Sequence, residues 1–152
     1  MRKRTRSREF ALQILFQLDI NHLDCAEVLE DFWKDRSDLA LSDKEKEVIE
    51  LDKKDMDIRV YTEKLVKGAL DNLELLDKII ERIAVHWAIK RMAYVDRNIL
   101  RLSAYELIYI EDMPVKVAIN EAVELAKRYG EPDSSKFVNG ILDKIAKTEC
   151  HK

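Results

Sequence analysis

Apolar residues recur at intervals of three and four along most of the chain, which is the spacing of one face of an α-helix. The first such stretch places Phe10, Ile14 and Leu18 one helical turn apart. This pattern predicts a first helix over about residues 7–20. No stretch alternates between apolar and polar residues for long enough to predict a strand.

A second helix is indicated where residues 24–27 read Asp-Cys-Ala-Glu, the pattern of a capping box. It opens a short helix whose apolar residues include Phe32 and Trp33. Over residues 35–57 the apolar content falls, and 11 of the 15 residues from 43 to 57 are charged. We expect this stretch to be an exposed connector. It contains a marginal helix that a capping pattern at Ser42 would start.

The remaining helices are bounded by polar caps and by the two prolines. Asp96 is expected to cap one helix, and Pro114 to start another that ends before Gly130 at the C′ position. Ser134 or Ser135 is expected to cap the last helix. Apolar stripes mark the helices that contain residues 58–73, 75–83, 99–108, 115–129 and 137–145. The chain is therefore predicted to be all-α, with about seven helices.

Composition agrees with this fold class. The chain has 152 residues, with only three glycines and two prolines, which disfavours a turn-rich β-sandwich or barrel. No apolar run approaches the ~18–20 residues of a membrane span, and the N-terminus has no apolar signal-peptide region. We expect a soluble, cytoplasmic protein that forms a single helical domain over residues 1–152.

The net charge of −3 conceals an asymmetry. Residues 2–8, here called the basic arm, carry five positive charges and no acid. The other 22 basic residues stand against 30 acidic ones, so the rest of the chain carries about −8. Only the arm and any basic patch beside it can meet a polyanion. The alternative is a solvated or cleaved tail, although the acidic Glu9 argues against a mitochondrial targeting segment.

Catalytic and metal-binding motifs are missing from the sequence. It contains no GxSxG, GxxxxGK[ST], GxGxxG or HExxH pattern. Cys25 and Cys150 are far apart and the three histidines are scattered, so neither a disulfide nor a zinc site is predicted. Glu121 and Glu124 lie three residues apart and could act as paired carboxylates, but Lys127 and Arg128 follow one turn later, so surface ion pairs at i, i+3 or i, i+4 are expected instead. We expect no enzyme activity, no cofactor and no metal.

Nucleic-acid binding is favoured by two features. The first is the arm, whose cations can neutralise phosphates or stack on bases of single-stranded RNA; they are Arg2, Lys3, Arg4, Arg6 and Arg8. The second is the polar start of the last helix, where backbone N–H groups and the helix dipole favour an anion near Lys136. Asn139 there is a candidate to read a base edge. The alternative makes Phe137 and Val138 core residues, Asn139 a packing hydrogen bonder and Gly140 a close helix contact.

Four segments also resemble a known family. Residues 114–130 (PVKVAINEAVELAKRYG) and 135–144 (SKFVNGILDK) are similar to the C-terminal signature of the transcription antitermination factor NusB family. Residues 6–18 (RSREFALQILFQL) and 96–107 (DRNILRLSAYEL) match it in the same order. The resemblance covers the chain except residues 35–57, where the family varies.

The resemblance implies a fold of two small helical bundles. It also implies pairing with NusE, a small-subunit ribosomal protein, and joint binding of the single-stranded boxA element of nascent RNA. That complex modifies elongating RNA polymerase so that ribosomal RNA operons are read through. By position, the residues on the RNA side would be Arg2, Lys3, Arg4, Arg6, Arg8, Lys136 and Phe137. Those on the NusE side would be Phe16, Asp96 and Arg97.

Two alternatives remain. The same fold occurs as the N-terminal module of ribosomal RNA cytosine methyltransferases, but this chain has no cofactor-binding α/β domain and is not expected to be that enzyme. The second alternative is a protein-only scaffold, in which a helical surface mediates homodimerisation or partner docking without sequence-specific RNA binding. The basic arm discriminates between this scaffold and an RNA-binding factor.

Overall fold

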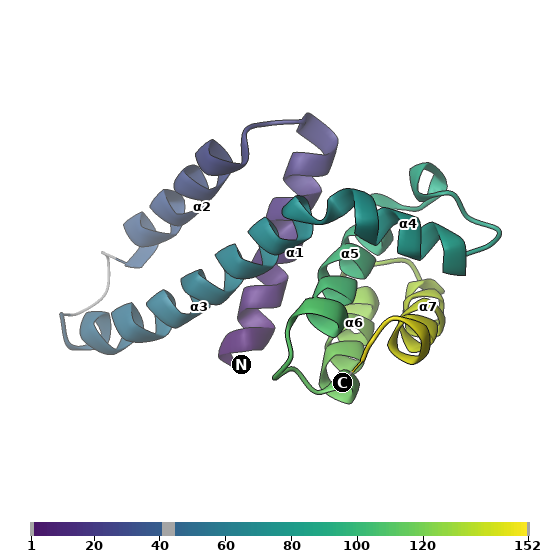
Figure 1. Ribbon diagram of the computed structural model, residues 1–152. Coiled ribbons are helices and arrows are strands. Elements are labelled where there is room, and N and C mark those ends of the chain that lie inside the picture. Colours follow the sequence, from purple (N-terminus) through teal and green to yellow (C-terminus); the bar gives the residue numbers. More distant parts are fainter. Residues whose placement is uncertain (1, 41–44, 152) are drawn as a thin grey trace. The chain divides into compact units, whose positions relative to one another are not determined.

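The computed structural model describes residues 2–40 and 45–151, and describes side chains outside residues 35–55. These residues form seven α-helices and one short 3₁₀ turn, and no strand occurs among them. The all-helical prediction is confirmed. The helices are α1 (Lys3–Asn21), α2 (Cys25–Ala40), α3 (Glu45–Asp71), α4 (Leu73–Ile83), α5 (Tyr94–Tyr109), α6 (Val115–Tyr129) and α7 (Ser134–Thr148), with the 3₁₀ turn η1 at Ile89–Arg91 (Figure 1).

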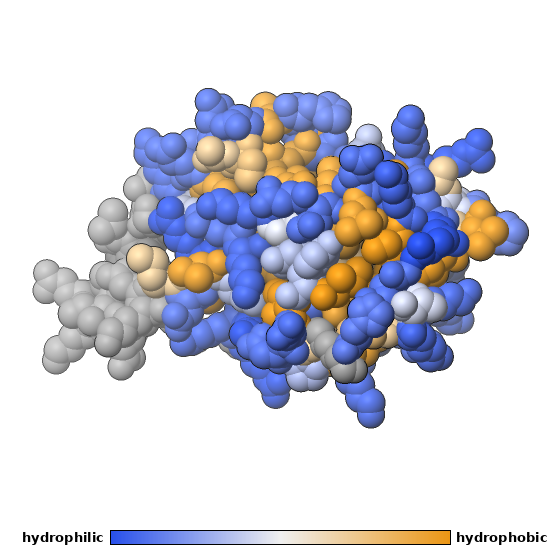
Figure 2. Space-filling view, in the orientation of Figure 1, coloured by the Kyte–Doolittle hydropathy of each residue, from blue (hydrophilic) through white to orange (hydrophobic). Residues whose placement is uncertain are grey.

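The helices divide into two compact units, residues 1–66 and 67–152, and α3 runs from the first unit into the second. On the face drawn in Figure 2, charged and polar side chains surround separate apolar areas. In the part of the chain that the structure describes, no helix combines the length and apolar character needed to cross a membrane.

In the first unit, α1 packs against α2 and against the middle of α3. The ring of Phe10 meets Phe32 and Trp33 of α2 edge-on, with centroid distances of 5.3 and 5.8 Å. On the α3 side, the fully buried Ser7 donates a hydrogen bond from Oγ to the carbonyl oxygen of Ile58 at 2.9 Å. A small hydroxyl at this position lets the two helix backbones approach closely and leaves no buried donor unpaired.

In the second unit, α5 packs against α6 and α7, and α4 contacts both α5 and α7. Arg101 of α5 donates from Nε and Nη2 to the two carboxylate oxygens of Asp77 on α4, at 2.8 and 2.9 Å. Such a bidentate pair fixes the geometry as well as adding energy. Arg82 at the end of α4 forms an ion pair with Glu149, just after α7. The fully buried core includes Leu76, Ile80, Ile99, Leu100, Leu107, Val138, Leu142 and Ile145.

The charged stretch between the predicted second and third helices differs from the expectation. Residues 35–40 continue α2 and residues 45–57 begin α3, so they are helical and are not a connector with marginal helix. The predicted capping residue Ser42 lies outside the described residues. A stretch of mixed charge with only a few apolar residues, such as Val48, Ile49 and Leu51, can still extend a helix, because Glu and Lys have high helix propensity. The prediction failed because it took a narrow apolar face as a sign of marginal helix.

Among the described residues, the cap predicted at Asp24 is correct, and those predicted at Asp96, Ser134 and Gly130 are wrong. Asp24 does cap α2, since the N–H of Glu27 donates to its Oδ2 at 3.3 Å. Asp96 does not cap α5, because the N-cap position is Ala93 and Asp96 lies inside the first turn. Likewise Ser134 is the first residue of α7, and its Oγ accepts from the N–H of Glu131 at 2.9 Å.

Gly130 ends α6 with φ −96° and so does not adopt the left-handed conformation expected of a C′ glycine. Its lack of a side chain matters for a different reason. A Cβ at this position would lie 2.6 Å from Oγ of Ser134. The glycine therefore makes room for the tight turn between α6 and α7.

Candidate nucleic-acid interface

The basic arm forms the first turns of α1. The helix begins at Lys3 and not at Ser7 as predicted, so most of the arm is helical. Positive side chains at a helix N-terminus oppose the helix dipole, which makes this an unfavourable place to start a helix. The contact of Ser7 with Ile58 of α3 compensates, because it anchors the second turn of α1 in the first unit.

Three of the arm's exposed cations have defined partners in the first unit. Lys3 forms an ion pair with Asp57 of α3, with Nζ 2.7 Å from Oδ2. The guanidinium of Arg4 lies 4.6 Å from the ring centroid of Tyr61, and that of Arg6 lies 4.7 Å from the ring of Phe10. These contacts already restrict the three side chains, so binding to a phosphate costs them less conformational entropy.

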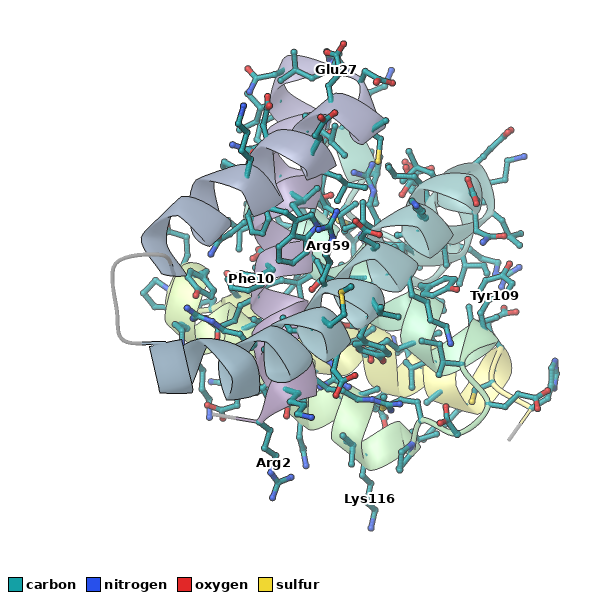
Figure 3. The ribbon with its side chains drawn as sticks, turned by 90° about the vertical axis from the view of Figure 1, so that its left-hand side faces the viewer. Arg2, Phe10, Glu27, Arg59, Tyr109 and Lys116 are labelled. Carbon is teal, nitrogen blue, oxygen red and sulfur yellow. The ribbon has the colours of Figure 1, made fainter. Side chains whose placement is uncertain are left out.

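Arg8 differs from the rest of the arm. It was predicted on the RNA side, but its side chain is only 2% exposed and lies 5.9 Å from the Tyr61 ring centroid. The helical period explains this position, because Arg8 falls three and seven residues before the buried Ala11 and Leu15. In contrast, Arg2 extends away from the end of α1 (Figure 3). The surface of the arm therefore consists of four cations instead of five.

The predicted site on α7 belongs to the second unit. Lys136 and Asn139 are exposed, Val138 is fully buried, and Phe137 is half-buried. The alternative in which Gly140 makes a close helix contact is excluded, since no described atom lies within 4 Å of where its Cβ would be. The start of α7 thus offers an open polar surface beside a half-buried aromatic ring.

An anion that bound at the start of α7 would lie beside an acidic side chain. Asp133 occupies the N-cap position of α7 and is exposed, as is Glu131 before it. A carboxylate at the positive end of the helix already satisfies the dipole. The helix terminus alone is therefore a weaker anion site than the sequence suggested, and Lys136 supplies its local positive charge.

Sequence reasoning missed Trp87, which lies between α4 and α5. Its side chain is 52% exposed, and its ring centroid is 6.3 Å from that of Phe137 at an interplanar angle of 78°. The available signal was a large aromatic residue in a segment without helical periodicity, followed by Lys90 and Arg91.

The residues predicted to face a protein partner fall in both units. Phe16 is half-buried on α1, one turn before the exposed Ile20. In the second unit, Arg97 is largely buried: its guanidinium lies 4.1 Å from the ring of Tyr94, and its Nη1 donates to the carbonyl of Ile89 at 3.2 Å. Arg97 therefore holds η1 against the start of α5.

Beside Arg97 on α5, Asp96 has one carboxylate oxygen that is buried and has no hydrogen-bond partner among the described residues. Within this same part of the chain, no group of three or more His, Cys, Asp or Glu side chains is placed to hold a metal ion.

Burial raises the pKa of the Tyr105 hydroxyl, with smaller contributions from Asp71 and Tyr109. This tyrosine packs directly over Gly68, so the raised pKa is explained by packing.

The fold and these surfaces define a class: small all-helical proteins that present ordered cations beside aromatic rings. A family model described as the NusB family matches residues 5–147. Proteins called transcription antitermination protein NusB are 37% identical in Thermodesulfovibrio yellowstonii, over 98% of this chain and 95% of that one, and 42% identical in Bacillus subtilis, over 94% of each. The chain belongs to the NusB family. This membership confirms the prediction that it is not an enzyme.

Solved structures agree with this assignment. The structure of T. maritima NusB superposes with a TM-score of 0.78 at 34% identity, covering 99% of this chain and 94% of that one. A structure of antitermination factors NusB and NusE in complex with dsRNA gives a TM-score of 0.75 at 31% identity, covering 97% and 98%.

Proposed function

We propose that this chain is an RNA-binding transcription antitermination factor. The observation that carries the proposal is the arm. Three of its four exposed cations lie on α1, and contacts with α3 hold this helix in place. Ordered cations bind phosphates with a smaller loss of conformational entropy than a flexible tail does. The family's name and the RNA present in a solved relative support the same function.

The RNA that we propose is the single-stranded boxA element of nascent ribosomal RNA transcripts. Guanidinium planes and exposed rings stack on bases only where those bases are unstacked from their neighbours. The solved NusB–NusE relative contains double-stranded RNA, so a duplex belongs among the ligands that are compared.

NusE is the proposed protein partner, and RNA polymerase with its antitermination complex is the proposed target, in the cytoplasm. The solved complex of a relative with NusE supports this pairing. We place NusE near Phe16 on α1 and near Asp96 and Arg97 on α5. Because the chain outside the arm carries about −8 and ribosomal proteins are generally basic, this association should weaken as salt is raised. Association that is insensitive to ionic strength would contradict the electrostatic part of the proposal.

The deciding experiment measures RNA binding by fluorescence anisotropy, with and without NusE. The oligonucleotides are a boxA sequence, a scrambled sequence of the same composition, and a duplex of boxA with its complement. We expect boxA to bind most tightly, and NusE to increase its affinity. Equal affinity for the boxA and scrambled strands would refute a sequence-specific function.

A second candidate is a protein-interaction module that dimerises without sequence-specific RNA binding. The observation in its favour is the exposure of Ile20 and Leu23 at the end of α1, next to the half-buried Phe16. Sedimentation analysis of the chain alone distinguishes the two candidates. A dimer that Ile20→Glu dissociates, together with equal binding of both strands, would favour the module.

A further inference from the structure

Trp87 is a large apolar side chain that the fold leaves half in solvent while holding its backbone in place. The backbone N–H of Trp87 donates to the carbonyl of Ala84 at 2.9 Å, just after α4. Two residues later, the N–H of Ile89 donates to Oε1 of Glu81 at 2.9 Å, and the Ile89 carbonyl accepts from Arg97. The segment is therefore tied to both α4 and α5, and the indole is displayed from an ordered turn.

The indole is also braced from the side. Its edge-to-face contact with Phe137 joins this turn to the start of α7. Such aromatic pairs have a preferred geometry, so the second ring restricts the rotation of the first. Phe137 is half-buried and Trp87 is more exposed. Of the two rings, Trp87 is therefore the one available to a ligand.

Basic residues stand close in sequence to both rings, and the carboxylate of Glu81 is tied to the same turn through the N–H of Ile89. Residues 85–91 contain no acid, and they include the exposed Lys90 and Arg91. On α7, Lys136 precedes Phe137, and the exposed Asn139 follows it. The acids of the neighbouring turn, at 131 and 133, come before the first residue of α7.

These surroundings favour one occupant over another. A docking site for an apolar protein segment needs a broad apolar face. In this turn, Trp87 and Val85 are the exposed large apolar residues, and two such residues do not form a broad face. One exposed ring, flanked in the sequence by the cations Lys90 and Arg91 and in contact with Phe137 beside Lys136, has the composition of a platform on which nucleic-acid bases stack.

We propose that Trp87 is an RNA-binding residue, on whose exposed indole face one unpaired base of the RNA stacks. Phe137 acts as a positioning residue that braces the indole, and Lys136 lies on the same helix to meet a neighbouring phosphate. This inference rests on the proposed RNA-binding function. It adds a stacking site in the second unit to the electrostatic surface of the arm.

The first test uses the fluorescence of the chain. It has two tryptophans, Trp33 in the first unit and Trp87 in the second. Trp33→Phe leaves Trp87 as the sole indole, and base stacking should quench its emission as boxA RNA is added. Where this variant fails to fold by circular dichroism, the difference between wild type and Trp87→Phe isolates the same signal. Emission that stays constant at saturating RNA would overturn the proposal.

The second test compares affinities for the boxA oligonucleotide. Trp87→Ala should weaken binding about tenfold, whereas Trp87→Phe should retain most of the affinity because it keeps a ring. Val85→Ala is the matched control, an exposed apolar residue two positions away, and should change nothing. The slope of affinity against salt should be the same in all variants, because no phosphate contact is lost.

Oligonucleotides with single abasic sites locate the contact. At the position that stacks on Trp87, removal of the base should abolish the effect of Trp87→Ala, while every phosphate is retained. A Trp87→Ala protein that binds boxA as tightly as wild type would overturn the proposal. So would weakened association with NusE combined with unchanged RNA binding, since the ring would then belong to the protein interface.

The two proposals fail in distinguishable ways. If wild type binds boxA and scrambled strands equally but Trp87→Ala weakens both, the boxA function fails and the stacking site stands. If wild type prefers boxA and Trp87→Ala changes nothing, the function stands and the stacking site fails. A wild-type protein that binds no RNA would refute both.

Discussion

Asp57→Asn should increase the affinity of the chain for RNA. In the structure the Asp57 carboxylate lies 2.7 Å from Nζ of Lys3, so it competes with any phosphate for that ammonium group. Their side chains are 64% and 50% exposed. An exposed pair of this kind contributes about 0–1 kcal/mol to stability, so its loss should barely change the melting temperature.

The gain in affinity can be bounded from the same geometry. At the 2.7 Å separation of the two groups, Coulomb's law in water gives about 1.5 kcal/mol, and a change of that size alters an affinity by slightly more than about tenfold. Salt reduces this further. We therefore expect Asp57→Asn to bind single-stranded RNA about two- to fivefold more tightly at low salt. The released Lys3 should also steepen the log–log salt dependence by about 0.7 for one additional phosphate contact.

The assay is fluorescence anisotropy over a series of salt concentrations, with two controls. Asp57→Glu keeps the charge and should behave as wild type. Asp143→Asn removes the same charge from another exposed pair, with Lys147 on α7 at 2.9 Å, and tests whether net charge alone is responsible. In a Lys3→Ala background, Asp57→Asn should lose most of its effect. An unchanged slope in Asp57→Asn, or an equal gain in Asp143→Asn, would refute the reasoning.

Three further predictions follow from burial and backbone geometry. Arg4→Ala should flatten the salt dependence of RNA binding by about 0.7 log–log units, whereas the buried Arg8→Ala should lower the melting temperature and leave that slope unchanged. An altered slope in the Arg8 variant would show that Arg8 reaches the RNA. His22→Gly should raise the free energy of unfolding in urea by about 0.5–1 kcal/mol, because His22 ends α1 at φ 52°; a loss of stability would mean that the imidazole makes a stronger contact. Gly68→Ala should lower that free energy by about 1–3 kcal/mol, because its Cβ would overlap a tyrosine ring of α5, while Gly140→Ala, in open space, should not lower it. Equal effects of the two glycine variants would contradict the packing argument.

Much of the secondary structure was predictable because its causes are local in the sequence. The apolar stripe of α1, the Asp24 cap of α2 and the start of α6 after Pro114 all depend on residues within one or two helical turns. The first turn of α1 was missed because the arm has no apolar period. The contact that holds it joins Ser7 to Ile58, which is 51 residues away.

The candidate site was predictable only in part. Residue type and order identified the family, the cations of the arm and the segment at the start of α7. Trp87 was missed because its exposure depends on which helices cover it. The alternative with a close helix contact at Gly140 is excluded for the same reason, because the space beside this residue is open and the sequence does not show which helices lie near it.

The sequence by itself determined the fold class, the separation of five positive charges from an acidic remainder, and the family. These follow from helical period, composition and motif order, which involve neighbours along the chain. Only the tertiary structure decided that Arg8 is buried, that Lys3 is paired with Asp57, and that the Trp87 ring is displayed. Burial and pairing depend on side chains that packing brings together from distant positions, and a linear pattern does not specify them.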